Sequence, residues 1–121
     1  MPHFRLETNV PKSKIPSGFL KETCKVVAKT LGKPESYCVT TVVPDAIMSW
    51  SGTDEPCGIA TLMSIGQLGT EQNKKHAKVL HDHVEKSLGI PNSRLYIHFI
   101  DASAADVGYQ ATTFHEIFGG K

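Results

Sequence analysis

The chain has 121 residues, of which 40% are hydrophobic and 21% are charged, a composition typical of one globular domain. Its 13 lysines and arginines nearly balance its 12 aspartates and glutamates. This charge favours neither nucleic acid nor an anionic membrane as the main partner. No apolar run approaches the roughly 20 residues that a membrane helix needs, so we expect no membrane insertion.

The beginning of the chain and its cysteines bear on its compartment. The first residues lack the basic region and the apolar core of a secretory signal. The cysteines are odd in number and lie among apolar residues, namely at Cys24, Cys38 and Cys57. Such usage predicts buried free thiols in a reducing compartment.

Alternating apolar and polar residues near the start predict a strand over residues 3–10. A helical period follows, with Ser17 as its expected N-cap. The apolar face of this helix would consist of Leu20, Cys24, Val27, Ala28 and Leu31. Gly32 fits the left-handed residue that ends many helices, and Pro34 prevents the helix from continuing.

The same order of elements returns in the second half. An apolar segment predicts a strand over residues 58–65, and a helix follows with Thr70 as its expected N-cap. The apolar face of this helix would consist of Ala77, Leu80, Val84 and Leu88. Gly89 and Pro91 then mark its end.

Two stretches of the chain are alike: LGKPESYCVT at 31–40 and LGIPNSRLYI at 88–97. Each closes a helix and opens a strand, so the chain reads β-α-β twice, with an offset of 57 residues. Two such units of one hand predict an α/β fold, a four-stranded sheet with two helices on one face. The expected plan is one domain over 1–121, with pseudo-repeats at about 2–56 and 57–114 and a C-terminal extension at 115–121.

The last strand, LYIHFID at 95–101, carries apolar residues on both sides. Leu95, Ile97 and Phe99 would point to one side of the sheet, and Tyr96, His98 and Ile100 would point to the other. Since the helices cover one face only, the second face needs another cover. Self-association is the simplest one, and we expect an oligomer.

Pro2 is the first candidate for chemistry. With Met1 removed, as is usual before a small residue, Pro2 presents a secondary amine at the start of a strand, where its missing N–H costs nothing. Burial and a nearby cation lower the pKa of an amine, and a neutral amine can act as a general base near pH 7. Lys33, in the loop after the first helix, is the candidate cation. Alternatively, Pro2 is a chance second residue and Lys33 a solvated charge.

Several further segments accompany these two residues: MPHFRLETNVP, LGKPESY, VVPD, SGTDEPC, LMSIG, NKKH, LGIPNSRLYI and DVGYQATTF. In this order and spacing they resemble the family of macrophage migration inhibitory factor and D-dopachrome tautomerase, within the tautomerase superfamily. The resemblance covers nearly the whole chain. It implies a homotrimer of βαβ repeats and a keto–enol tautomerase whose N-terminal proline is the base.

The resemblance also implies roles for residues near the start of the first strand. Pro2 matches the catalytic proline, and Lys33 matches the lysine that holds the substrate carboxylate and lowers the pKa of the amine. Ser64 and Ile65 match the pair whose backbone approaches the substrate. For Ile65, simple packing is the stronger alternative.

Other matched positions would form the pocket wall. Tyr96 matches a tyrosine contributed by a neighbouring subunit, and Val107 and Phe114 match apolar wall positions. His98 stands where vertebrate members have asparagine, and Tyr109 stands where a tryptophan is common. Packing is an alternative for each, above all for Val107.

The remaining histidines are expected at the surface. His81 and His83 lie on nearly opposite sides of a helix, and His76 is too far from His83 for a common ligand set, so we expect no metal and no cofactor. Cys57-Gly58-Ile59-Ala60 lacks the second thiol of the Cys-x-x-Cys in vertebrate members. A thiol oxidoreductase role is therefore unsupported.

Two functions stay open at this point. The first is a tautomerase of small aromatic α-keto or α-enol carboxylates, such as phenylpyruvate, and of dopachrome-like compounds. The second is a cytokine-like signalling protein of innate immunity that binds a cell-surface receptor. Family members are described as both, and as exported without a signal peptide, so we expect the protein in the cytoplasm and also secreted.

Overall fold

The computed structural model describes residues 1–120 and contains two β-α-β units in succession. The main elements are β1 (His3–Thr8), α1 (Phe19–Leu31), β2 (Val39–Val43), β3 (Gly58–Ser64), α2 (Thr70–Leu88) and β4 (Leu95–Asp101). After them come β5 (Gly108–Tyr109), β6 (Thr112–Thr113) and α3 (Phe114–Ile117). Short 3-10 turns lie at Lys12–Lys14, Glu35–Tyr37, Asn92–Arg94 and Ala104–Asp106. The predicted repeat of β-α-β is confirmed.

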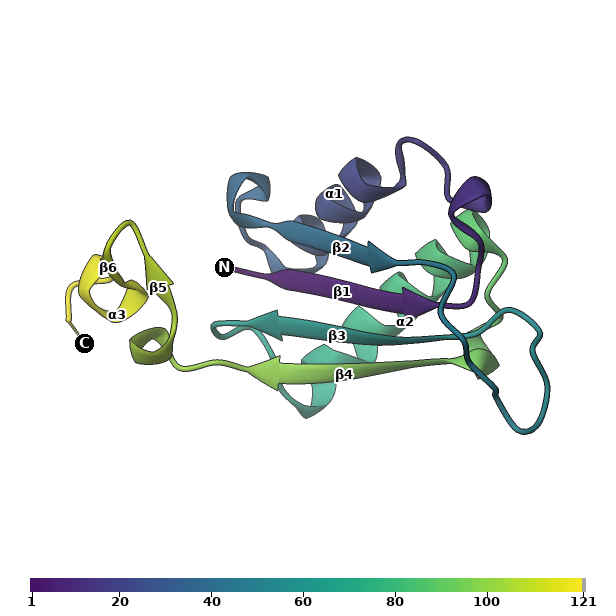
Figure 1. Cartoon of the computed structure of the whole chain (residues 1–121). Coiled ribbons are helices and arrows are strands. Elements are labelled where there is room, and N and C mark those ends of the chain that lie inside the picture. Colours follow the sequence, from purple (N-terminus) through teal and green to yellow (C-terminus); the bar gives the residue numbers. More distant parts are fainter. Residues whose placement is uncertain (121) are drawn as a thin grey trace.

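The first four strands form one sheet in the order β2-β1-β3-β4. The pairs β1–β2 and β3–β4 are parallel, and each is joined by a crossover helix, as a parallel connection requires. The two units meet at the antiparallel pair β1–β3. Both helices lie behind the same face of this sheet (Figure 1). The predicted α/β fold with two helices on one face is confirmed.

Strand alternation fills the space between sheet and helices. Phe4 and Leu6 of β1 and Leu62 of β3 are fully buried there, against Leu80 and Val84 of α2. Since side chains of a strand alternate between its two faces, the residues between these point to the open face. The open face carries Val39, Thr41, Val43, His3, Arg5, Glu7, Ile59, Thr61, Met63, Tyr96, His98 and Ile100. It is thus more polar than the pattern of β4 alone predicts.

The C-terminal ends of both helices are as predicted, and their N-terminal ends are not. Gly32 and Gly89 adopt left-handed φ values of 65° and 73° after α1 and α2, which confirms the predicted C-terminal ends. The predicted N-caps are wrong by one residue, because α1 begins after Gly18 and α2 after Gly69, neither with a side-chain cap. Glycine at this position leaves the first N–H groups of a helix to solvent or neighbours.

The buried face of α1 also differs from the prediction. Leu20 is 46% exposed, whereas Phe19 and Thr23 are buried beside Val27 and Leu31. Thr23 can lie in the core because its hydroxyl donates to the Phe19 carbonyl at 2.6 Å. The buried stripe therefore differs from the hydrophobic pattern only in the first half of α1, since Val27, Ala28 and Leu31 are buried as predicted.

Beyond β4 the chain forms an arm that projects past the end of the sheet, with β5, β6 and α3 at its tip (Figure 1). Phe114 is buried within this arm, whereas Ile117 and Phe118 remain exposed. The predicted extension at 115–121 therefore includes the end of α3 and the turn that follows, and its last residue lies outside the described residues.

Candidate active site

Pro2 is fully buried at the beginning of β1. Its carbonyl accepts a hydrogen bond from the Val39 N–H at 3.0 Å, and the next residue, His3, pairs with Val39 on one side and Met63 on the other. Pro2 is therefore held at the end of the sheet, between the first residue of β2 and the last residues of β3. Its nitrogen is an amide here because Met1 precedes it.

Lys33 and Ile65 meet at this end of the sheet. The αL turn at Gly32 brings Lys33 out of α1, and its ammonium donates to the Ile65 carbonyl at 2.7 Å. Ser64, the last residue of β3, is buried and donates its hydroxyl to the Gly66 carbonyl at 3.0 Å. These contacts fix the backbone after β3, while the Lys33 ammonium keeps two more N–H groups for an anion.

The electrostatics of this end favour a neutral amine. Burial lowers the pKa of the Met1 amine below its ordinary value, the positive charge of Lys33 lowers it further, and Cys38 acts weakly in the opposite direction. Pro2 is more deeply buried than Met1. The same two causes would therefore act on a Pro2 amine once Met1 is removed.

An aromatic cluster stands beside these groups. The rings of Tyr109 and Phe114 stack with centroids 5.2 Å apart, and Tyr37 meets both edge-on at 5.9 and 6.2 Å. Phe118 adds a fourth ring, 5.5 Å from Phe114. Val107 is half-buried at its base, where its carbonyl accepts from the Phe114 N–H at 3.1 Å.

Sequence reasoning did not assign a role to Tyr37 or Phe118. The signal for Tyr37 was its place in LGKPESY, the same segment that carries Lys33. Phe118 lies beyond the segments that resemble the family, and its apolar side chain, which suggests only that it docks somewhere, was its one signal. The structure brings both into the cluster with Tyr109 and Phe114.

Tyr96 and His98 lie away from the Pro2 of their own chain. Tyr96 pairs with Ile59, which faces Glu7, so it lies about five residues or roughly 16 Å along the sheet from Pro2. It is 68% exposed, and its ring packs against Trp50 with centroids 4.6 Å apart. His98 lies exposed on the open face, in the middle of the edge strand β4.

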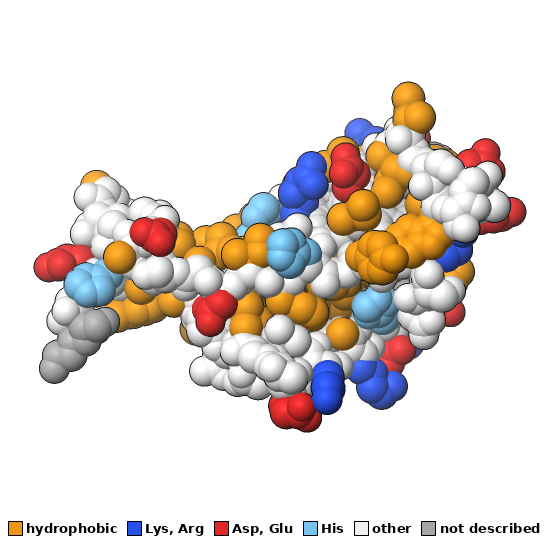
Figure 2. Space-filling view, turned by 90° about the horizontal axis from the view of Figure 1, so that it is seen from below, with side chains coloured by type: hydrophobic (Ala, Val, Ile, Leu, Met, Phe, Trp, Pro, Cys, Tyr) orange, Lys and Arg blue, Asp and Glu red, His pale blue; other side chains and the backbone are white. Residues whose placement is uncertain are grey.

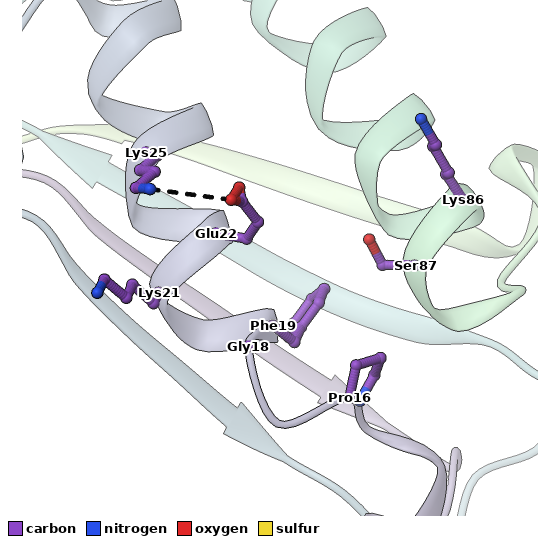
Figure 3. A pocket seen from close by; sticks show the side chains of 8 residues that line it. All are labelled: Pro16, Gly18, Phe19, Lys21, Glu22, Lys25, Lys86 and Ser87. Carbon is purple, nitrogen blue, oxygen red and sulfur yellow. Dashed lines mark ion pairs between the residues drawn. The ribbon is translucent and has the colours of Figure 1, made fainter.

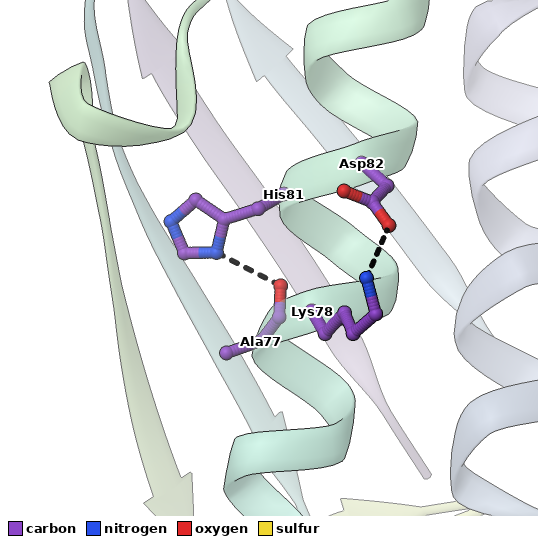
Figure 4. A network of polar contacts seen from close by, with 4 residues as sticks. All are labelled: Ala77, Lys78, His81 and Asp82. Atoms are coloured by element: carbon purple, nitrogen blue, oxygen red, sulfur yellow. Dashed lines mark hydrogen bonds and ion pairs between the residues drawn. The ribbon is translucent and has the colours of Figure 1, made fainter.

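Two hollows of the helical layer lie apart from these residues. A groove of about 530 Å³ runs between the N-terminal turn of α1 and the C-terminal turn of α2, where Lys25 pairs with Glu22 at 4.0 Å (Figure 3). A second hollow lies beside His81. One ring nitrogen of His81 lies 2.8 Å from the Ala77 carbonyl (Figure 4), and the other lies 2.8 Å from the Leu95 carbonyl. Within residues 1–120, no group of three or more His, Cys, Asp or Glu is arranged to hold a metal.

The prediction that the helix histidines lie at the surface is wrong for His76, and His81 and His83 are half-buried. His76 is only 3% exposed, and both of its ring nitrogens have hydrogen-bond partners. His83 stacks on Phe19 with centroids 5.4 Å apart and lies 2.8 Å from the Thr23 hydroxyl. Burial lowers the pKa of His83, against a weaker opposing effect of Glu22.

The cysteines are free, as predicted, within the described part of the chain. Cys57 is buried, while Cys24 and Cys38 are half-buried. Burial, followed by the neighbouring Cys24, raises the pKa of the Cys38 thiol and so disfavours its reactive thiolate at neutral pH.

Hydrophobic side chains gather along the edge of the body and over the neck that leads to the arm (Figure 2). The exposed apolar residues of the four-stranded sheet include Val39, Ile59, Tyr96 and Ile100. A single chain leaves this surface open, which agrees with the expectation of an oligomer. No helix in residues 1–120 has both the length and the apolar character needed to cross a membrane.

Comparison with known proteins gives a consistent result. The family model described as "Macrophage migration inhibitory factor (MIF)" matches residues 1–115. The chain is 44% identical over 114 residues to a macrophage migration inhibitory factor homolog of Trichuris trichiura, covering 94% of this chain and 100% of that protein. It is 42% identical over 114 residues to macrophage migration inhibitory factor of Mus musculus, covering 94% of this chain and 99% of that one.

Solved structures agree with these sequence matches. The macrophage migration inhibitory factor of Trichinella spiralis superposes with a TM-score of 0.91 at 40% identity, covering 93% of this chain and 99% of that one. The homologue from Prochlorococcus marinus gives a TM-score of 0.87 at 32% identity, covering 93% and 98% of the two chains.

Proposed function

The chain belongs to the macrophage migration inhibitory factor family, within the tautomerase superfamily, and from this we propose that it is a keto–enol tautomerase with Pro2 as its general base. Its substrates are small aromatic α-keto or α-enol carboxylates of the phenylpyruvate type and dopachrome-like compounds. The observation that carries the proposal is the position of Pro2, buried at the beginning of β1, where burial and Lys33 lower the pKa of the terminal amine.

In the proposed reaction, removal of Met1 turns the Pro2 nitrogen into a secondary amine. The neutral amine takes a proton from the carbon beside the keto group, and the electron pair of that C–H bond forms the C=C bond of the enol. The electron pair of the C=O π bond moves to the carbonyl oxygen, which takes a proton from solvent, and the protonated Pro2 amine then releases its proton to solvent, so no atom is gained or lost overall. The Lys33 ammonium binds the carboxylate with the N–H groups that Ile65 leaves free.

The proposed pocket is shared between subunits of a homotrimer. One chain contributes Pro2 and Lys33, the backbone at Ser64 and Ile65, and a wall that consists of Val107, Tyr109 and Phe114. A neighbouring chain contributes Tyr96 and His98. The exposure of Tyr96 and the open face of the sheet support this arrangement. In this proposal residues 1–121 act as one domain, and activity depends on assembly.

A second function is supported by the names of the relatives, which include macrophage migration inhibitory factors of mammals and amphibians. We propose as an alternative that the protein is a secreted, cytokine-like ligand of a cell-surface receptor, with the pocket secondary. In either case we propose that it occurs in the cytoplasm and is released without a signal peptide.

The test of the enzyme uses three preparations whose N-termini are confirmed by mass spectrometry. The processed protein should tautomerise phenylpyruvate. Pro2→Gly should retain a weaker activity, because a primary amine remains. One residue added before Pro2 should lower kcat by at least about 100-fold, since an amide cannot be a base. Full activity in a preparation that retains Met1 would refute Pro2 as the base.

A further inference from the structure

His76 is a buried ionisable residue that the proposed reaction does not use. It lies on α2, is 3% exposed, and uses both of its ring nitrogens. Nδ1 lies 2.8 Å from the hydroxyl of Thr30 on α1, and Nε2 lies 2.8 Å from the backbone carbonyl of Gln67. The side chain therefore connects α1 with the segment that follows β3.

The partners fix the direction of both hydrogen bonds in the neutral ring. The carbonyl of Gln67 can only accept, so Nε2 carries the hydrogen. Nδ1 is then an acceptor, and the hydroxyl of Thr30 donates to it. His76 thus has one defined tautomer, and its two hydrogen bonds bridge two segments that are far apart in the sequence.

Both hydrogen-bond partners of His76 lie close in sequence to residues of the proposed site. Thr30 lies three residues before Lys33, and Gln67 lies two residues after Ile65. The direct contact between these segments is the 2.7 Å bond from the Lys33 ammonium to the Ile65 carbonyl. His76 and Lys33 therefore connect the same two segments, the end of α1 and the turn after β3, and the buried His76 does so from inside the molecule.

The segment after β3 needs such support. Gly66 and Gln67 both have left-handed backbones, with φ values of 78° and 63°. Glycine tolerates this conformation, but a residue with a Cβ adopts it at a cost and keeps it only where its surroundings hold it. The bond from His76 acts on the carbonyl of that residue.

We propose that His76 is a positioning residue that holds the 65–67 turn against the end of α1 and so keeps Lys33 where it binds the substrate carboxylate. This inference rests on the proposed function. Lys33 keeps its bond to the Ile65 carbonyl while its other N–H groups bind the carboxylate, so the position of its ammonium depends on the turn that His76 holds in place. Loss of His76 should therefore weaken the binding of the carboxylate more than the proton transfer itself.

The chain supplies a matched control at the other end of the same two helices. His83 of α2 lies 2.8 Å from the hydroxyl of Thr23 on α1, the same pair of residue types at the same distance as His76 and Thr30. It packs on Phe19 at the start of α1, far from Lys33 at its end. His83→Leu removes a histidine–threonine contact between the helices without touching the 65–67 turn.

The experiment compares wild type, His76→Leu, His76→Gln and His83→Leu as assembled, processed proteins. The substrates are phenylpyruvate and its methyl ester, which lacks the charged carboxylate. His76→Leu should raise KM for the acid about tenfold with a smaller change in kcat, and should leave KM for the ester near the wild-type value. His76→Gln, which keeps a donor and an acceptor, should recover most of the loss. In His83→Leu, any change in KM should be the same for the acid and the ester.

Hydrogen exchange provides a readout that does not depend on activity. The backbone amides of residues 65–67 should exchange faster in His76→Leu than in wild type or His83→Leu. If His76→Leu does not fold, Thr30→Val removes only the hydroxyl, and a smaller change in the same direction is expected. An equal rise in KM for the acid and the ester in His76→Leu would overturn the proposal. So would the same KM values and exchange rates in His76→Leu and His83→Leu. A wild type inactive on both substrates would instead refute the proposed function, while exchange would still decide the role of His76.

Discussion

Replacing Lys33 by methionine separates the two effects assigned to its charge. Methionine keeps most of the length of the side chain and removes the ammonium. In the structure that ammonium makes one charge-assisted hydrogen bond, to Ile65 at 2.7 Å, and in the proposed complex it makes another to the substrate carboxylate. Hydrogen bonds to charged groups contribute about 1.5–3 kcal/mol, so KM for a carboxylate substrate should rise by about 10- to 150-fold.

The second effect is on the pH dependence. The charge of Lys33 lowers the pKa of the terminal amine, so removing it raises this pKa. The acid limb of the profile of kcat/KM reports the amine in the free enzyme, and it should move to higher pH in Lys33→Met. Burial is the larger cause of the lowered pKa, and it remains in the variant. The pKa of the amine in Lys33→Met should therefore rise but stay below the pKa of an exposed amine.

The assay is the tautomerisation of phenylpyruvate from pH 5 to 9, with Lys29→Met as control. Lys29 is exposed on α1, one turn before Lys33, so its replacement removes an equal charge at a greater distance from the amine. An acid limb that stays in place or moves to lower pH in Lys33→Met would refute the electrostatic reasoning. The same limb shift in both variants would assign the effect to net charge and not to Lys33.

Two other consequences can be measured on the same preparations. Sedimentation at micromolar concentration should show three copies of the chain, because the open sheet face and Tyr96 remain exposed in one copy; a stable, active monomer would contradict the shared pocket. Stability should fall as the pH drops below about 6.5, since the pKa of His83 is lowered in the folded state and the unfolded chain then binds the proton first. Urea unfolding at fixed protein concentration checks this, and His83→Gln should flatten the dependence.

The predictable parts of the fold depended on local signals. Gly32 and Gly89 end the helices with left-handed backbones, and Pro34 and Pro91 are extended residues that lie before the next strands. Each of these residues lies within a few positions of the helix end or strand that it specifies. Such signals can be recognised without any distant partner. The repeat of β-α-β, and with it the order of layers, therefore followed from the sequence.

The missed features depended on hydrogen bonds, one local and one between residues far apart in the chain. Thr23 appeared too polar for the core, because the pattern does not show its bond to the carbonyl of Phe19. His76 appeared to be a surface residue, because Thr30 lies 46 positions away in sequence. A buried histidine with both nitrogens satisfied loses little on burial, whereas an unsatisfied one is costly. Hydrophobic periodicity carries no information about that satisfaction.

The proposed roles of Lys33 and His76 depend on each other, and a double-mutant cycle makes this dependence measurable. If His76 acts by holding Lys33 in place, its loss should cost little once the ammonium is gone. KM for phenylpyruvate in the double variant Lys33→Met with His76→Leu should then lie close to that of Lys33→Met alone, so the two losses should not add. The pair of Lys33→Met with His83→Leu should behave additively, because His83 contacts neither Lys33 nor the 65–67 turn. Full additivity in the first pair would mean that His76 acts through packing alone, whatever its single variant does to binding.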